Sequence, residues 1–213
     1  MRSPITWSAL ATIGLLLGSA SVLPAQTFFQ NTTGIASPAL TITFDEHVLP
    51  TGSSVTNEYS DLGVTFSPNV YYSPQVFPTF NIDGTTVGNF NFNGAPIIVP
   101  FDIVFSTVQT DVGFAFITNP GTSTFEALLG GVVVATGTAA TDVNLPNDFY
   151  GFIGGSFDTI RVTSGGSNNS SLLDNLQIGS ASVTPEGSSL AMLAFGGLPF
   201  VIGFGRKLRR KTA

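Results

Sequence analysis

Residues 40–45 read Leu-Thr-Ile-Thr-Phe-Asp, and this stretch introduces the pattern that decides the fold class. The apolar side chains of Leu40, Ile42 and Phe44 alternate with polar ones, as in a β-strand with one buried and one exposed face. Similar short runs rich in Val, Ile, Phe and Thr recur along the chain, and these residues favour strands. We expect the further strands at residues 62–67, 97–105, 110–118, 124–129, 132–136, 149–153, 159–163 and 172–178.

Turn-forming residues separate these runs, and Gly130-Gly131 between two apolar runs predicts a tight hairpin. The central part of the chain shows no helical stripe with caps. Many short strands with frequent turns predict an all-β fold, an antiparallel β-sandwich or jelly roll, over residues 40–180. The 19 Phe residues and the single Trp indicate a core built from Phe. Residues 26–39 are small and polar, which predicts a loose leader or linker.

The N-terminus has the three parts of a secretory signal peptide. Arg2 supplies the positive charge, and an apolar run over residues 9–17 follows it. Small residues then offer cleavage after Ala20 or after Ala25, and we favour Ala25, which gives a signal peptide at residues 1–25. The apolar run is too short for a stable membrane span, so a retained anchor is the less favoured alternative.

The charges are distributed unevenly between the tail and the rest of the chain. Between Gln26 and Pro185 there is one basic residue, Arg161, against twelve acidic residues. Such a surface repels nucleic acid and anionic membranes, and it attracts cations or simply keeps the protein soluble. The chain has no Cys, which excludes disulfides, thiol nucleophiles and thiolate metal sites.

The C-terminal region is the most specific feature of the sequence. Pro185-Glu186-Gly187 precedes an uncharged apolar stretch over residues 188–205, and a basic cluster at residues 206–211 follows. Eighteen helical residues extend about 27 Å, close to the thickness of a bilayer core. A basic cluster at the end of such a helix favours the cytoplasmic side. The pattern therefore predicts one C-terminal transmembrane helix.

This tail, residues 181–213, resembles the PEP-CTERM sorting signal, in which a Pro-Glu-Pro-like motif precedes a membrane helix and a terminal Arg-rich patch. Pro185 and Glu186 match the first two motif positions, whereas Gly187 stands where a second proline is usual. The resemblance implies recognition by an exosortase-like membrane protease, cleavage near the motif, and delivery to a bacterial cell surface or extracellular matrix. A plain C-terminal membrane anchor is the alternative.

The globular part is also similar to the β-sandwich domains found ahead of such tails. The resemblance lies in four short segments, at residues 42–45, 62–66, 157–160 and 173–176. The similarity implies no particular ligand.

Few residues could support catalysis. His47 is the only histidine, and no Gly-x-Ser-x-Gly nucleophile motif lies at a strand-to-helix turn. His47 at a strand end is interpreted as a surface residue. Paired carboxylates of a glycan-active enzyme are a less favoured hypothesis, because twelve acids make chance pairs common. We therefore expect that the protein is not an enzyme.

A calcium site is the best-motivated candidate site. If the alternation from Leu40 continues, Glu46 lies on the apolar face of its strand, and Asp174 shares a face with the apolar residues of the last strand. Buried unpaired carboxylates are unfavourable, and calcium accepts oxygen ligands alone. Asp45, Glu46 and Asp174 are the candidate ligands, in an arrangement that resembles the calcium sites of jelly-roll binding modules. The alternative is that the strand ends bend and leave these acids in solvent.

A carbohydrate site is the second candidate. Residues 68–96 are less regular and predict long loops at one end of the sandwich, where binding residues tend to lie. Tyr71 and Tyr72 are the visible aromatics there, and only one of them would line a given surface. The leading hypothesis is an exported surface or matrix protein with a structural or adhesive role. The alternative is a carbohydrate-binding module that holds matrix polysaccharide.

Overall fold

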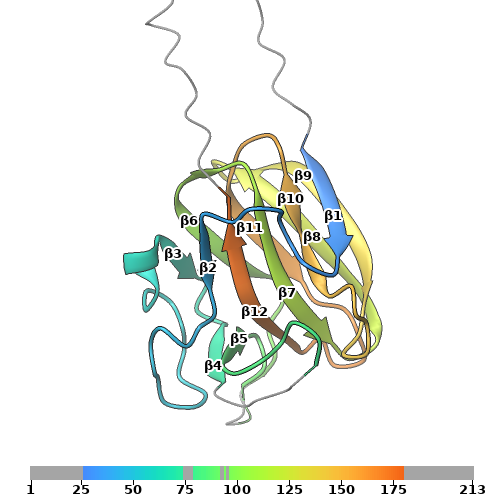
Figure 1. The fold of residues 1–213 in the computed structure, drawn as a ribbon. Coiled ribbons are helices and arrows are strands. Elements are labelled where there is room, and N and C mark those ends of the chain that lie inside the picture. The colour runs from blue at the N-terminus through green and yellow to red at the C-terminus, as the bar shows by residue number, and fades with distance from the viewer. Residues whose placement is uncertain (1–25, 74–78, 92–93, 95, 180–213) are drawn as a thin grey trace, which may run out of the picture.

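Two antiparallel β-sheets packed face to face make up the fold in the computed structural model (Figure 1). The structure describes residues 26–73, 79–91, 94 and 96–179. The predicted signal peptide at residues 1–25 and the predicted tail at residues 181–213 lie outside the described residues.

Sheet A, the larger sheet, has seven strands in the order β1-β10-β7-β12-β5-β4, and β2 pairs with β12 beside β5. These strands are β1 (Thr27–Asn31), β2 (Leu40–Ile42), β4 (Tyr71–Ser73), β5 (Thr86–Gly88), β7 (Val112–Thr118), β10 (Phe149–Ile153) and β12 (Ser171–Ile178). Sheet B has five strands in the order β3-β6-β11-β8-β9. They are β3 (Val64–Phe66), β6 (Phe101–Gln109), β8 (Gly121–Leu129), β9 (Val132–Thr141) and β11 (Phe157–Thr163). One 3-10 turn, η1 (Ser60–Leu62), precedes β3.

The strand connections cross between the sheets. Neighbours in sequence such as β6 and β7, or β9 and β10, lie in opposite sheets, whereas β8 and β9 form a hairpin within sheet B. Gly130 and Gly131 form the turn of this hairpin with φ angles of 57° and 81°, as a two-residue type I′ turn requires. The hairpin predicted from Gly130-Gly131 is confirmed.

Phe and Tyr side chains fill the space between the sheets, as the composition predicts. Phe116 of sheet A meets Phe125 of sheet B edge to face with ring centroids 5.5 Å apart. Tyr150 stacks on the same Phe125 at 5.0 Å. Offset and edge-to-face aromatic pairs of this kind add stability beyond the area that they bury.

A second, smaller apolar cluster lies on the outer face of sheet A. Ala115 and Ile117 alternate with the inward-facing Phe114 and Phe116, so they lie on the opposite side of the sheet. The cluster is completed by side chains of neighbouring strands and of covering loops, namely Ile82, Phe149 and Leu172, with Phe29, Phe90 and Val143 packed against them. Sheet A is therefore apolar on both faces.

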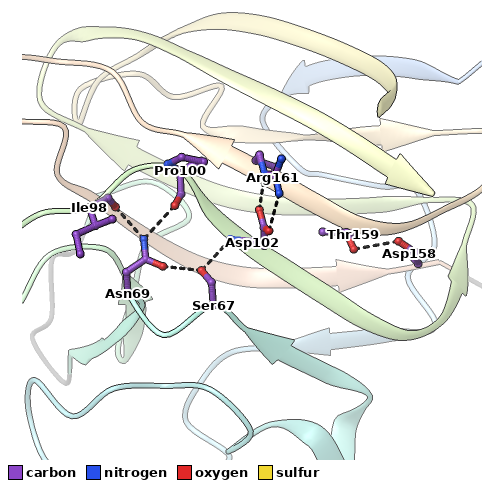
Figure 2. Close-up of polar contacts among 8 residues, drawn as sticks. All are labelled: Ser67, Asn69, Ile98, Pro100, Asp102, Asp158, Thr159 and Arg161. Carbon is purple, nitrogen blue, oxygen red and sulfur yellow. Dashed lines mark hydrogen bonds and ion pairs between the residues drawn. The ribbon is translucent and has the colours of Figure 1, made fainter. Parts of the chain in front are cut away.

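Sheet B has polar contacts on its outer face instead (Figure 2). Arg161 on β11 donates two hydrogen bonds to Asp102 on β6, from Nε to Oδ1 at 2.8 Å and from Nη2 to Oδ2 at 3.0 Å. Beside this pair, Ser67 Oγ accepts the Asp102 N–H and donates to Asn69 Oδ1, while Asn69 Nδ2 donates to two carbonyls in segment 98–100. Arg161 faces outward, as its alternation predicts.

Two sequence-based predictions about loops are wrong. Residues 26–39 are not a loose leader throughout, because β1 pairs with β10 over its whole length. Phe28 anchors β1 by stacking on Phe125 at 5.5 Å and by packing against Gly137, where a Cβ atom would leave it no room. The segment 68–96, expected to be loops, also contains the short strands β4 and β5.

Both ends of the described chain lie at the same end of the sandwich. Thr27 pairs with Ile153, and the neighbouring Phe152 pairs with Val112, which is also the partner of Ile178. The opposite end of sheet A holds the end of β7 and the start of β12, where Ser171 pairs with Thr118.

Candidate functional site

Asp174 is completely buried in β12, although it carries no basic partner. Its Oδ2 accepts the backbone N–H of Asp83 at 2.9 Å, and its Oδ1 accepts that of Asn175 at 2.6 Å. The pKa of Asp174 is raised to about 7, chiefly by burial; the two backbone hydrogen bonds lower it, and the negative charges of Asp45 and Asp83 add to the rise. The expected burial of Asp174 is confirmed.

Asp174 shares its face of β12 with Leu172 but not with Leu176 and Ile178, in contrast to the prediction. The pairing of β12 with β7 shifts register between Asp174 and Gln177, and Asn175 has a φ of 48°. Because of this bulge, Leu172 packs in the outer cluster, whereas Leu176 packs between the sheets. Strict alternation would have placed Asp174 on the same face as both leucines.

The three candidate calcium ligands do not form one cluster. Strand β2 ends at Ile42, and Phe44 has a φ of 61°, so the alternation does not continue to Glu46. Glu46 is exposed, and its Oε1 accepts hydrogen bonds from the backbone N–H and the hydroxyl of Thr43 at 2.9 and 3.1 Å. Asp45 accepts the N–H of Thr85 at 3.3 Å. Among the described residues, no three His, Cys, Asp or Glu side chains lie close enough together to hold a metal ion.

Only one of the two predicted aromatic ligand contacts is accessible. Tyr72 is 1% exposed and belongs to the core between the sheets, so it cannot line a ligand-binding surface. Tyr71 is half-buried and pairs with Gly88 in the short β4–β5 ladder. Because side chains alternate along β4, one of the two tyrosines lies in the core. The sequence-based assignment of Tyr72 as a ligand-binding residue is therefore wrong.

His47 is a surface residue, in agreement with its interpretation. Its Nε2 lies 3.1 Å from Asp61 Oδ1, and its ring packs beside Tyr59 with centroids 5.2 Å apart. Asp61 is exposed, so this pair is in contact with solvent.

A cavity that the sequence did not predict lies at the end of sheet A where β7 stops and β12 starts. Its volume is about 350 Å³, within the lower range of small-molecule sites. Apolar side chains of the outer cluster form much of its lining, and polar side chains of two loops complete it. The lining consists of Phe90, Ile117, Thr118, Asn119, Val143, Asn168, Ser170, Ser171 and Leu172.

Two asparagines at the cavity fix one another's orientation. Asn168 Oδ1 accepts the backbone N–H of Ser170 at 3.2 Å and its hydroxyl at 2.7 Å. A backbone N–H can only donate, so the Asn168 atom facing it must be the oxygen. The same oxygen accepts from Asn119 Nδ2 at 2.8 Å. Each amide has one further polar atom: Asn119 Oδ1, which is an acceptor, and Asn168 Nδ2, which is a donor. Both residues are exposed.

Glycines allow the two loops that carry these asparagines to touch. A Cβ atom at Gly165 would lie 2.0 Å from the carbonyl oxygen of Thr122, and one at Gly166 would lie 2.5 Å from that of Asn119. Gly166 also has a φ of 99°, which L side chains rarely adopt. The sequence marks both loops only as turns, and nothing in it indicates that they lie in contact.

The buried amide of Asn89 holds the segment that carries Phe90. Asn89 Oδ1 accepts the N–H and the hydroxyl of Ser171 at 2.8 and 2.9 Å. Its Nδ2 donates to Ser164 Oγ at 3.1 Å and to the carbonyl of Asn169 at 2.9 Å. Phe90 is thereby fixed against the start of β12.

Three buried hydroxyls support the same end of the sandwich. Thr141 Oγ1 lies 2.7 Å from both Thr118 Oγ1 and Ser123 Oγ, and Ser123 Oγ accepts the N–H of Gly165 at 3.0 Å. A fully satisfied polar network of this kind gives its surroundings a defined geometry.

Comparisons of the chain with family models, with curated proteins and with solved structures gave no match. The helices that the structure describes include none with the length and apolar character needed to cross a membrane. The sorting motif Pro185-Glu186-Gly187 and the predicted membrane helix at residues 188–205 lie outside the described residues.

Proposed function

We propose that this protein is an exported, surface- or matrix-associated β-sandwich with an adhesive role, sorted through its C-terminal tail by an exosortase-like membrane protease. The three-part tail at residues 185–211 supports the sorting step, and the signal-like N-terminus supports export. The strand orders β2-β12-β7-β10 and β6-β11-β8-β9 support a jelly roll, the more specific form of the sandwich.

The observation that carries the adhesive role is the position of the cavity relative to the tail. Strand β12 runs from Ser171, which lines the cavity, to Ile178, which is one residue short of the end of the described chain. Eight strand residues extend about 26 Å. A domain held by its tail would therefore present the cavity on the side that faces away from the membrane.

The lining of the cavity supports binding in preference to catalysis. The side chains of its described lining residues are apolar groups, amides and hydroxyls, without a carboxylate, an imidazole or an amine among them. General acid–base catalysis needs a group that gains and loses a proton near neutral pH. We accordingly propose a non-enzymatic role for this site.

Fractionation of a bacterium that makes both the full chain and an exosortase-like protease tests the proposal. The full chain should be found on the cell surface or in the matrix, where an added protease can reach it. A Pro185→Ala/Glu186→Ala variant should accumulate as the uncut membrane form. A Ser188→Ala/Ser189→Ala variant, which alters neighbouring residues outside the motif, should behave like the full chain. Retention of the full chain in the cytoplasm would overturn the proposal.

A further inference from the structure

The geometry points to a saccharide site in the cavity between the end of β7 and the start of β12. A neutral sugar would pack against Phe90 and form hydrogen bonds with the amides of Asn119 and Asn168 through neighbouring hydroxyls. Only the source of the sugar, a matrix polysaccharide, rests on the proposed surface location. The binding site itself is argued from the cavity.

The first argument is the pairing of hydrogen-bonding groups. Asn119 Oδ1 accepts and Asn168 Nδ2 donates, and the hydrogen bond between the two side chains holds both amides in fixed positions. A sugar hydroxyl both donates and accepts, so two neighbouring hydroxyls match an acceptor next to a donor. Water reaches both amides in the free protein because the two residues are exposed, and an apolar ligand that covered them would leave both amide groups without partners, which is unfavourable.

The second argument is the apolar lining. Phe90, Ile117 and Leu172 give the cavity an apolar wall that continues the outer cluster of sheet A. Sugar rings have C–H groups on their faces and hydroxyls on their edges, so a ring can contact such a wall while its edge meets the amides. Sites for small molecules typically combine an apolar lining with a few polar groups in this way.

The third argument is charge. None of the lining residues that the structure describes carries a charge, and the surrounding chain from Gln26 to Pro185 is strongly acidic. Acidic glycans and phosphates would be repelled, and a cation would find only neutral amide and hydroxyl oxygens in the described lining. The cavity is also small, at about 350 Å³, which favours a terminal or short saccharide unit over an extended chain.

The fourth argument is rigidity. The Asn89 hydrogen bonds fix Phe90 against β12, and the glycine contacts fix the loop that carries Asn168 against the β7–β8 turn. A site formed before the ligand arrives loses less conformational entropy on binding than one that must first be ordered.

The test uses the full chain in a detergent without a sugar head group. Binding of neutral oligosaccharides of glucose, galactose, mannose and N-acetylglucosamine would be measured on a glycan array and then by calorimetry. Asn168→Asp keeps the oxygen that accepts from Ser170 and Asn119 but replaces Nδ2, the donor proposed to bind the sugar, with an acceptor. We expect it to weaken binding about tenfold or more, and Phe90→Ala to do the same.

Matched controls separate the site from general effects. Asn57→Asp makes the same change at an exposed position outside the cavity lining, and Phe80→Ala removes an aromatic ring that is 56% exposed and outside the lining. Both should bind like the parent chain. Thermal unfolding of each variant would check that it is folded.

Three outcomes would overturn the saccharide site. In the first, the protein binds none of the neutral oligosaccharides. In the second, the two control substitutions weaken binding as much as Asn168→Asp and Phe90→Ala do. The third outcome is that an apolar dye binds in the cavity and no sugar displaces it. Since these measurements use purified protein, they do not depend on where the protein is located. A cytoplasmic protein that binds sugars would contradict the proposed function alone.

Discussion

The outer faces of the two sheets differ in what covers them. On sheet A, loops from several parts of the chain lie across β7, β10 and β12, and they build a second apolar cluster against the sheet. Every residue of β7 is buried as a result. On sheet B, strands β6 and β9 remain open on the outside, and side chains such as Val108 and Val132 are 47% and 67% exposed.

This difference explains where the special features of the molecule are found. The buried carboxylate Asp174 and the cavity beside Asn168 both lie where loops cover sheet A. Sheet B has the exposed ion pair between Arg161 and Asp102 instead. Covering a sheet with loops brings backbone amides and polar side chains to a place from which water is largely excluded. Such places can hold ligands or perturbed charges.

The largest expected effect comes from breaking the second cluster. Phe149→Ala removes a ring that is 3% exposed on the outer side of sheet A. It should lower the free energy of unfolding by about 3–5 kcal/mol, as for other buried aromatic truncations. Val108→Ala on the outer face of sheet B is the control and should change it by less than about 0.5 kcal/mol. Urea unfolding measures both free energies. If the two variants lost the same amount of stability, the outer faces of the two sheets would not differ in their contribution to it.

The next effect is a dependence of stability on pH. The pKa of Asp174 is about 7 in the folded protein, against an ordinary value of 3.8. Below about pH 4 Asp174 is protonated in both states, and its stabilising contribution is then complete. As the pH rises toward 7, the unfolded chain releases this proton before the folded protein does. The free energy of unfolding therefore falls by a few kcal/mol, at about 1.4 kcal/mol for each unit by which the two pKa values differ.

Asp174→Asn should remove this pH dependence, at the cost of a constant loss of about 1 kcal/mol for one hydrogen bond. Thermal unfolding of both proteins between pH 4 and pH 8 would measure the difference in slope. Asp158→Asn on sheet B is the matched control. A variant with the slope of the parent chain would contradict the assignment to Asp174.

Addition of calcium to the same samples tests the calcium site predicted from the sequence, and a rise in melting temperature that is lost in Asp174→Asn would support it.

A smaller effect is expected at the contact between the two loops at the cavity. Gly165→Ala places a Cβ atom against the backbone of Thr122 and should destabilise the fold by about 1–3 kcal/mol. Ser167→Ala in the same loop, at an exposed position, should have almost no effect. Circular dichroism on heating would compare the two, and equal melting temperatures would mean that the loops do not need close contact.

The smallest effect is expected on the outer face of sheet B. Arg161→Met keeps the apolar part of the side chain and removes its charge, while the side chains of Arg161 and Asp102 are 37% and 26% exposed. The expected loss is below about 1 kcal/mol and should shrink further in 1 M salt. A loss as large as that of Phe149→Ala would mean that this face contributes as much as the covered one.

Much of the fold could be predicted from the sequence. The prediction places the strands at residues 149–153 and 172–178 to within one residue, because each is a short, largely apolar run that ends at a glycine, Gly154 or Gly179. Strand β1 was missed because Phe28 and Phe29 stand side by side without alternation, and each packs on a different face of sheet A. A fully covered sheet such as sheet A does not show the alternation that reveals a half-exposed one.

The candidate site was harder to predict. The burial of Asp174 could be foreseen from its apolar neighbours, but the bulge that turns Leu176 to the opposite face could not. The cavity depends on hydrogen bonds between residues far apart in the chain, such as Asn119 and Asn168. Each of these asparagines adjoins a turn signal, and no local pattern indicates that the two turns meet.

The last described strand, β12, is also the strand on which sheet A depends. It pairs with β7 on one side and with β2 and β5 on the other, so it joins segments made early and midway through synthesis. Until Ser171–Ile178 has been made, β2 and β5 have no neighbour on that side, and sheet A stays divided. Sheet A therefore cannot be completed before β12 has been made, and a product truncated before Ser171 would expose apolar strand edges and be prone to aggregation.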